Sequence, residues 1–270
     1  KWVHGRRGWE NDLFQSIHSW PDHTPRVWMH CSSLGEFEQG RPILEAIREQ
    51  YPHYRILLTF FSPSGYELRK NYPVADHVCY LPADTRTSSH RFIDIVRPNL
   101  VLFVKYDFWF NYLSEVQKRH IPLILISALF RPDQIFFKPY GKWFAGILAG
   151  FSSIFTQNES SRQQLQQIDI DAQVAGDTRV DRVVQIVKEA RKFPDIARWA
   201  TASRLLIGGS TWPEDEAILQ QWWKQQQKQG KWQLILAPHD ISEKHLQQIE
   251  DLFGPQQVIR YSRLTSAARE

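Results

Sequence analysis

The chain has 270 residues, of which 42% are hydrophobic and 23% charged, a composition of folded proteins that excludes the disordered and fibrous classes. That length suits one large domain or two smaller ones. The net charge of +4 fits a partner that carries phosphate or carboxylate, and it is too weak to indicate nucleic acid as the partner.

Two further compositional features bear on compartment and cofactors. Cys31 and Cys79 are the only cysteines, and neither lies in a CxxC motif, so we expect a reducing compartment. No metal or other cofactor is predicted, because no HExxH or paired-histidine spacing occurs. No run reaches the roughly 18 to 20 apolar residues that span a bilayer. The chain opens on Lys1 without a methionine, so we expect it to be part of a longer protein.

Apolar strands alternate with helices over the first two thirds of the chain. The predicted strands are residues 26–30, 54–61, 78–81, 100–104, 123–127, 153–156 and 172–175. Helices are predicted at 12–18, 36–50, 66–71, 85–96, 108–120 and 159–167. Several of these strands are apolar throughout rather than alternating, which indicates a parallel sheet covered on both faces.

A second alternating run follows a looser, charged stretch. Strands are predicted at 204–208, 233–237 and 256–260, with helices at 214–227 and 242–252. A doubly wound domain usually has five or six strands, so the second domain reads as truncated. We therefore divide the chain into a first domain at residues 1–190, a linker at 191–203 and a partial second domain at 204–270.

The first predicted strand runs into a small-residue turn and a carboxylate, Glu36. The carboxyl end of a strand beside a helix N-terminus is where open α/β sheets bind ligands, so Glu36 is a candidate catalytic base. The pattern from Ser33 to Glu36 is also that of a capping box, in which the glutamate only completes a helix end. Gly35 allows a ligand to approach closely, and both interpretations stay open.

Other polar residues follow later strands in the same way. Ser62, Ser64 and Gly65 follow the second strand, and their hydroxyl and backbone N–H groups suit an anion, or simply form an ordinary turn. Asp107 follows the strand at 100–104, either as part of the same site or as a helix cap. Arg131 follows the strand at 123–127 and could bind a phosphate or carboxylate in bidentate fashion.

The segment at residues 135–144, here called the aromatic segment, mixes aromatic residues with lysines. It is typical either of a patch that touches a lipid surface or of a core helix with two exposed lysines, and the sequence favours neither.

Three later turns add hydroxyls and backbone N–H groups beside predicted strands. None matches a Walker A or GxGxxG pattern, so ATP and dinucleotides are disfavoured as ligands. Their candidate residues are Gly176, Arg179, Ser210, Thr211, Glu214 and His239.

Taken in order, these motifs resemble the 3-deoxy-D-manno-octulosonic acid (Kdo) transferase family. The matching pieces are residues 30–36 (H-x-x-S-x-G-E), 59–65 (T-x-x-T/S-P-x-G), 157–159, 176–181 and 209–214. The form of residues 37–40 is similar to the Bacteroidetes branch. The resemblance implies a GT-B fold, in which two Rossmann-like, doubly wound parallel-sheet domains flank the active site.

The resemblance also implies a reaction. The family transfers Kdo from CMP-Kdo to a lipid A precursor with inversion and without a metal, at the cytoplasmic side of the inner membrane, and its catalytic glutamate corresponds to Glu36. By the same resemblance, we expect the first domain to bind the acceptor and the second the donor. The implied acceptor-binding residues are Ser33, Gly35, Ser62, Ser64, Gly65, Asp107 and Arg131, and the implied donor-binding residues are Gly176, Arg179, Ser210, Thr211, Glu214 and His239.

The chain departs from the family at several positions. The family's Glu-Thr-Glu-Leu-Trp is residues 105–109 here, of which Asp107 and Trp109 carry over, and the lysine of its Gly-x-x-Lys motif is Arg179. The family's membrane anchor and the second half of its donor domain have no counterpart in these 270 residues. The alternatives are a GT-B glycosyltransferase or epimerase acting on another nucleotide sugar, and an inactive binding fragment.

Overall fold

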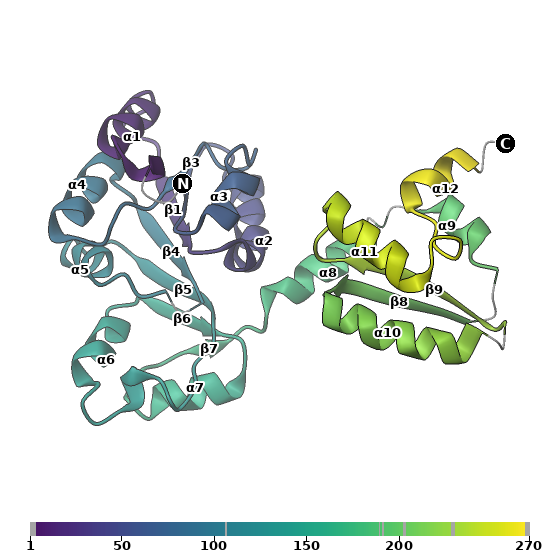
Figure 1. Ribbon diagram of the computed structural model, residues 1–270. Coiled ribbons are helices and arrows are strands. Elements are labelled where there is room, and N and C mark those ends of the chain that lie inside the picture. Colours follow the sequence, from purple (N-terminus) through teal and green to yellow (C-terminus); the bar gives the residue numbers. More distant parts are fainter. Residues whose placement is uncertain are drawn as a thin grey trace. The chain divides into compact units, whose positions relative to one another are not determined.

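The chain folds into two compact units, Lys1–Glu189 and Ala190–Glu270 (Figure 1). The computed structural model describes residues 4–105, 107–188, 190, 192–201, 204–227 and 230–267. The acceptor and donor roles that we assigned to the two domains remain predictions.

The first unit is built on one seven-stranded parallel sheet, in the order β3-β2-β1-β4-β5-β6-β7. The strands are β1 (Arg26–Cys31), β2 (Arg55–Phe60), β3 (His77–Tyr80), β4 (Leu100–Val104), β5 (Leu123–Ala128), β6 (Ser153–Thr156) and β7 (Gln173–Val174). The sequence predicted all seven, and the residues of β1, β2, β4 and β5 are largely buried on both faces, as in a parallel sheet covered by helices.

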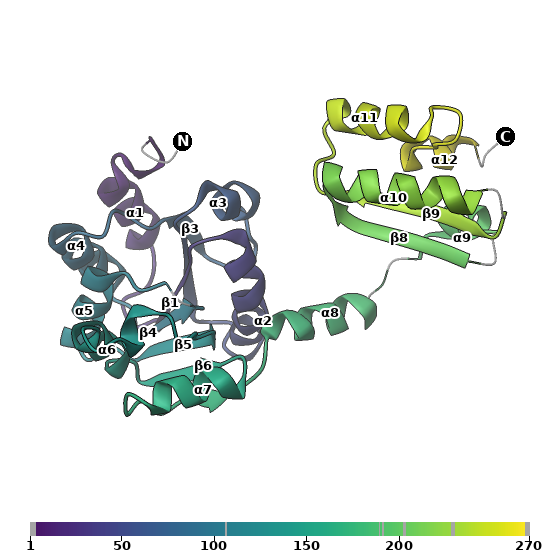
Figure 2. The same ribbon diagram turned by 60° about the horizontal axis from the view of Figure 1, so that its bottom comes forward.

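Helices cover both faces of this sheet (Figure 2). The helices of the unit are α1 (Trp9–His18), α2 (Leu34–Gln50), α3 (Pro63–Arg69), α4 (Arg86–Val96), α5 (Phe110–Lys118), α6 (Lys142–Ala149), α7 (Glu159–Gln166) and α8 (Thr178–Lys188), with short 3-10 turns η1 (His4–Arg6) and η2 (Ile135–Phe137), and of these α8 runs away from the sheet. Helix α8 was not predicted, although its valines recur at helical spacing.

Alternate residues of each strand feed two separate cores. On β1, Trp28 packs with α1, α4 and α5, whereas Met29 and Cys31 pack with α2. Gly40 lets α2 lie close to the sheet, because a Cβ there would come within 2.6 Å of the Met29 sulfur. The two cores fix α2, and with it the turn between β1 and α2, against the sheet.

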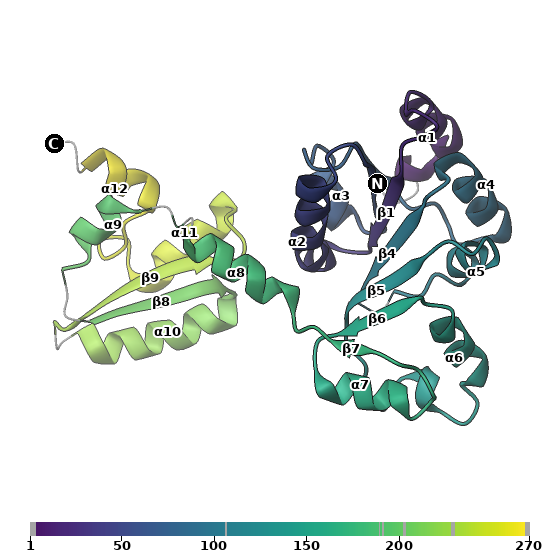
Figure 3. The same cartoon turned by 180° about the vertical axis from the view of Figure 1, so that it is seen from behind.

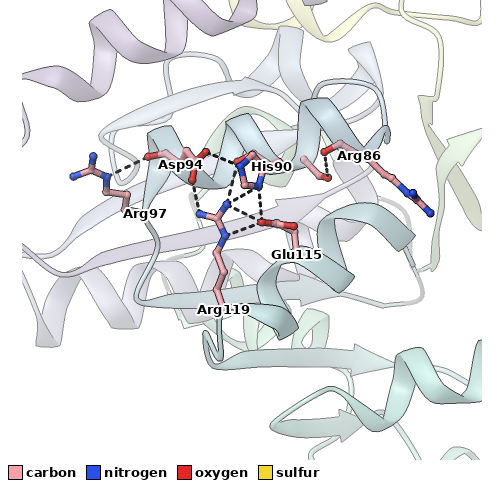
Figure 4. Close-up of polar contacts among 7 residues, drawn as sticks. Arg86, His90, Asp94, Arg97, Glu115 and Arg119 are labelled. Atoms are coloured by element: carbon pink, nitrogen blue, oxygen red, sulfur yellow. Dashed lines mark hydrogen bonds and ion pairs between the residues drawn. The ribbon is translucent and has the colours of Figure 1, made fainter.

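An ion-pair network joins α4 to α5 on the outer surface of the unit (Figure 4). The Arg119 guanidinium donates to Asp94 at 2.7 Å and to Glu115 at 2.8 Å. His90 lies 2.9 Å from the same Glu115 carboxylate. The network ties the C-terminal end of α5 to α4.

The second unit contains a two-stranded parallel sheet, β8 (Arg204–Thr211) and β9 (Trp232–Pro238), within its described residues (Figure 3). Its helices are α9 (Pro194–Trp199), α10 (Pro213–Gln226), α11 (Glu243–Phe253) and α12 (Tyr261–Ala267). The stretch assigned to a linker, 191–203, thus contains a helix, α9, and α12 was not predicted either.

The strand predicted at 256–260 is wrong, since the structure has a turn there. Gly254 ends α11 with a φ of 94°, and the N–H of Gln257 closes a turn onto its carbonyl at 2.9 Å. The Arg260 side chain then binds back to α11, donating to Glu250 and Glu243 at 2.7 Å each. These contacts hold the segment against its own helix instead of extending it beside β9.

Candidate functional site

Glu36 occupies the first turn of α2, immediately beyond the carboxyl end of β1. The Ser33 side chain accepts from the Glu36 N–H at 3.4 Å, and the Glu36 carboxylate accepts from the Ser33 N–H at 3.1 Å, completing a capping box. The Glu36 side chain is nonetheless only 7% exposed, an unusual burial for a carboxylate in a surface turn. The cap therefore holds the carboxylate in place, and the capping and catalytic interpretations are compatible.

A second carboxyl group, Asp107, faces Glu36 from the loop after β4. The two side chains share a hydrogen bond, so we call Glu36 and Asp107 the carboxyl pair. Burial raises the pKa of both groups, and the charge and hydrogen bond of Glu36 further raise the pKa of Asp107, to about 7. Near neutral pH the pair therefore takes up or releases one shared proton, which is the behaviour required of a general base.

His30, at the end of β1, lies beside the pair but carries no charge. Its imidazole is 1% exposed, and burial followed by the charge of Arg6 lowers its pKa to about 3. Its Nε2 atom accepts from the Trp109 indole at 3.0 Å and lies 4.0 Å from Asp107. His30 and Trp109 both lie within the family motifs found in the sequence, but neither was among the predicted site residues.

Strained backbone marks the same edge of the sheet. Lys105, directly after β4, has a φ of 73°, and Ser127, near the end of β5, has a φ of 50°. Non-glycine residues rarely adopt this conformation, and such positions cluster at active sites as well as after helices, as at Arg97 and His120 here. The Lys105 cation lowers the pKa of both Glu36 and Asp107, opposing the effect of burial.

The turn after β2 adjoins the turn after β1. The Ser62 N–H donates to the Ser32 carbonyl at 2.7 Å, and Ser62 caps α3 through the Ser64 N–H at 3.3 Å. The hydroxyls of Ser62 and Ser64 lie 3.0 Å apart at the surface. The structure thus brings the Ser33 and Ser62 turns side by side, as their shared edge predicted.

The two glycines of these turns differ in their surroundings. A Cβ on Gly65 would lie 2.3 Å from the Phe60 ring, so packing requires a glycine there. A Cβ on Gly35 would meet only the Ser33 hydroxyl, at 3.9 Å. The space beside Gly35 is therefore open to a ligand.

A polar network ties α2 to the start of α8. The Arg179 guanidinium donates to Asp177, and this ion pair lowers the Asp177 pKa to about 2. Gln39 of α2 donates to the same carboxylate at 3.2 Å, and the Thr178 hydroxyl donates to the Gln39 carbonyl at 2.6 Å. Gly176, with a φ of 83°, forms the bend before this network.

Arg131 does not join this arrangement within the described contacts. Its side chain is 65% exposed and lies 3.6 Å from Asp133 in the same loop, while its backbone N–H donates to Gln134. Of the residues predicted for the first domain, it is the one placed at the surface away from Glu36 and Asp107.

In the second unit, the ends of β8 and β9 lie together. The Ser210 hydroxyl is 3.0 Å from His239 Nδ1, and the His239 ring stacks on Trp212. Ser210 has a φ of 57°, the third strained position at a strand end. Exposed hydroxyl and imidazole groups at this edge suit a phosphate or sugar hydroxyl.

Glu216 is a buried carboxylate of this unit, along with Glu250, and the sequence analysis did not single it out. The Thr211 hydroxyl donates to Glu216 at 3.0 Å, and His245 Nε2 lies 3.1 Å from the same carboxylate. Glu214, the predicted residue, is exposed at the start of α10. The one hint in the sequence is that Glu216 lies in the first turn of α10, five residues after Thr211 at the end of β8.

The described residues contain no group of three or more His, Cys, Asp or Glu side chains that could hold a metal ion. No helix among them is both long and apolar enough to cross a bilayer.

The aromatic segment follows neither of its two interpretations completely. Phe136 and Phe137 of η2 and Phe144 of α6 pack into the core. Tyr140 and Trp143 are 75% and 57% exposed. The segment is a 3-10 turn and a short helix rather than one core helix, and it leaves two aromatic side chains at the surface among the segment's lysines.

Comparison with known proteins matches most of the first unit to one family. The model of the family described as 3-deoxy-D-manno-octulosonic-acid transferase (kdotransferase) matches residues 6–182. A 3-deoxy-D-manno-octulosonic acid transferase of Haemophilus influenzae is 34% identical over 104 residues, 38% of this chain and 24% of that protein. One of Chlamydia pneumoniae is 28% identical over 201 residues, 70% of this chain and 45% of that protein. The chain spans less than half the length of these relatives.

The fold is shared with solved structures of low sequence identity. The crystal structure of UDP-GlcNAc 2-epimerase from Neisseria meningitidis, bound to UDP-GlcNAc, has a TM-score of 0.58 and 15% identity, covering 85% of this chain and 69% of that one. This likeness, together with the parallel sheets, places the chain among α/β proteins of the GT-B type.

Proposed function

Because the chain belongs to the 3-deoxy-D-manno-octulosonic-acid transferase family, we propose that it serves an inverting transfer of Kdo from CMP-Kdo to a lipid A precursor, with Glu36 as the general base. The observation that carries this proposal is the buried carboxyl pair at the carboxyl edge of the first sheet. A base near neutral pKa is what removal of a proton from a sugar hydroxyl requires.

The proposed step is balanced within the two substrates and the pair. The carboxyl pair takes the proton of the acceptor hydroxyl, and the hydroxyl oxygen forms a bond to the anomeric carbon of Kdo. The bond between that carbon and the phosphate oxygen breaks, and CMP leaves with the bonding electrons. Attack from the face opposite the phosphate inverts the anomeric centre.

The remaining predicted residues have roles that their positions support. Gly35 leaves open space beside Glu36, and the Ser62 and Ser64 hydroxyls lie at the adjacent turn, so we assign both to the acceptor. Within the second unit, the Ser210–His239 contact offers hydrogen bonds for the donor's phosphate and sugar. Arg179, which is ion-paired with Asp177, stays a predicted donor-binding residue.

Replacing Asp107 with asparagine tests the pair directly. Asparagine keeps the shape but cannot hold the proton that Asp107 takes up at about pH 7, so Glu36 alone is left to titrate. Activity of the wild-type protein should decline as pH falls through about 7, where the pair takes up its proton. In the Asp107→Asn variant this decline should move to lower pH, and the rate at pH 8 should fall about 10- to 100-fold because the base is weaker.

The measurement is the pH profile of kcat/KM with CMP-Kdo and a lipid A precursor. Asp133→Asn is the matched control, since Asp133 is an exposed carboxylate beside Arg131. An Asp107→Asn profile that coincides with that of the wild type would exclude a shared proton.

We assign the protein to the cytoplasmic face of the inner membrane, where a lipid acceptor would be reached. The exposed Tyr140 and Trp143 of the aromatic segment, with Lys138 and Lys142 beside them in sequence, have the composition of a membrane-interface patch. The rings would enter the headgroup region and the lysines would meet lipid phosphates.

The double variant Tyr140→Ser/Trp143→Ser should bind vesicles about tenfold more weakly, because two aromatic side chains lose the apolar area that inserts. Co-sedimentation with vesicles of phosphatidylethanolamine and phosphatidylglycerol measures this. Phe14→Ser, an equally exposed aromatic on α1, is the control. Equal binding by the wild type and the double variant would rule the patch out.

A further inference from the structure

We infer that Trp109 is a positioning residue for the carboxyl pair. Its indole N–H donates to Nε2 of His30 and so fixes the imidazole in the form that carries its hydrogen on Nδ1. Asp107 therefore faces an imidazole nitrogen that has no hydrogen to offer it. The inference rests on the proposed role of the pair as a base, and it assigns the state of His30 to a single hydrogen bond.

The Nδ1 side of His30 faces Thr59 on the neighbouring strand β2. The Thr59 hydroxyl lies 2.9 Å from His30 Nδ1 and accepts from the Trp28 indole at 2.8 Å. Its contact with the Met29 carbonyl is long, at 3.4 Å, so the hydroxyl can either donate to Nδ1 or accept from it. Thr59 therefore suits both neutral tautomers of His30, and the choice between them falls to the Nε2 side.

The Nε2 side is set by Trp109. The indole Nε1 is only a donor, and at 3.0 Å it requires Nε2 of His30 to accept. The Trp109 ring is held by Phe61, at a centroid distance of 4.5 Å, and its residue is the N-cap of α5. The Ser32 hydroxyl, 3.4 Å from Nε2, can donate to the same lone pair only weakly.

This arrangement determines what Asp107 meets. Its Oδ2 atom is buried 4.0 Å from His30 Nε2 and has no hydrogen-bond partner among the described residues. Because 4.0 Å is too long for a hydrogen bond, an imidazole with its proton on Nε2 would act on that oxygen through its N–H dipole, and would so stabilise the ionised carboxylate. Trp109 prevents this, so Asp107 and Glu36 keep a high affinity for their shared proton.

Other charged groups near the pair act in known directions. Lys105 lowers the pKa of both carboxyls, and Arg6 lowers the pKa of His30, which keeps the imidazole neutral. The thiol of Cys31 is buried beside the pair, and its pKa is raised by burial and by both carboxylates. None of these groups donates a hydrogen bond to Asp107 Oδ2 in the described contacts. The group whose hydrogen could affect this oxygen is therefore His30, and Trp109 determines which nitrogen of His30 carries that hydrogen.

The test is the Trp109→Phe variant of the full-length protein, in which phenylalanine keeps the ring stacked near Phe61 but removes the N–H. In protein labelled with ¹⁵N-histidine, two-bond ¹H–¹⁵N spectra should show His30 protonated on Nδ1 in the wild type and on Nε2 in the variant. The ¹³C-carboxyl titration of Asp107 should move to lower pH by about one unit. The acid limb of the kcat/KM profile should shift with it.

Trp9→Phe is the matched control, because Trp9 packs on Phe92 in the same unit without contacting the pair. It should leave both spectra and the profile unchanged. A wild-type His30 protonated on Nε2, or an Asp107 titration unmoved in Trp109→Phe, would overturn the inference. The two NMR readouts need no substrate, so a failure of the proposed transfer reaction is distinguishable from a failure of this inference.

Discussion

Replacing Glu36 with glutamine should lower the rate of Kdo transfer by about 10²- to 10⁴-fold while the protein stays folded. Glutamine cannot take the proton of the acceptor hydroxyl. It can still accept from the Ser33 N–H, since glutamine serves as well as glutamate in a capping box. The thermal midpoint should therefore stay close to that of the wild type, and the loss should appear in kcat.

The matched control for this variant is Glu38→Gln, two residues along the same helix. Glu38 binds Arg69 at 2.9 Å and lies 3.8 Å from Arg41, so it forms ion pairs rather than part of the carboxyl pair. Its replacement should leave kcat within about twofold, because partly exposed ion pairs contribute little. Near-normal turnover by Glu36→Gln would make Glu36 a helix cap only.

Replacing Gly65 with alanine should destabilise the first unit by about 1–3 kcal/mol. The added Cβ would lie 2.3 Å from the Phe60 ring and 3.2 Å from the Leu34 backbone nitrogen. Phe60 is fully buried between β2 and the helices, so its ring has no free space to move into. Urea or thermal unfolding followed by circular dichroism measures the change.

Gly35→Ala is the control for that experiment. Gly35 lies in the first turn of α2 with open space around it, so alanine should raise stability by up to about 1 kcal/mol. If Gly65→Ala were as stable as Gly35→Ala, the packing explanation for Gly65 would be wrong. A loss of activity in Gly35→Ala at full stability would show that the ligand needs the open space.

Several strands of the first unit could be predicted because their apolar sequences fit only a strand that is buried on both faces. Residues 100–104 and 123–126 are apolar without interruption, and a short apolar run between turn signals fits a parallel strand. The segment at 256–260 has only Val258 and Ile259 as apolar residues, and Arg260 binds Glu250 and Glu243 of α11. Tertiary ion pairs of this kind leave no local signal.

The helices that the sequence did not predict were missed for different reasons. Helix α9 begins at Pro194 after a phenylalanine, without a side-chain cap, and is six residues long. Helix α8 had a detectable pattern, with Val180, Val183, Val184 and Val187 at helical spacing. Those side chains are largely exposed. Their spacing therefore indicates a helix but not a helix that packs into the core.

The candidate site was partly predictable. The ends of parallel strands show which residues lie at the carboxyl edge of the sheet, but not which of these residues are adjacent. Glu36 and Asp107 each follow a strand, and β1 and β4 are adjacent in the sheet, so their carboxyls meet. The sequence alone could not show the order of strands, and therefore could not show the pair. It also could not show that Arg131 turns to Asp133, because a loop residue's direction depends on its surroundings.

The most direct test of the proposed function is the mass of a lipid A precursor after incubation with CMP-Kdo and the full-length protein. The wild type should add the mass of Kdo, and Glu36→Gln should add none in the same time. UDP-GlcNAc in place of CMP-Kdo should give no product. A wild-type protein that leaves the lipid unchanged, or that converts only UDP-GlcNAc, would contradict the assignment of the carboxyl pair to Kdo transfer.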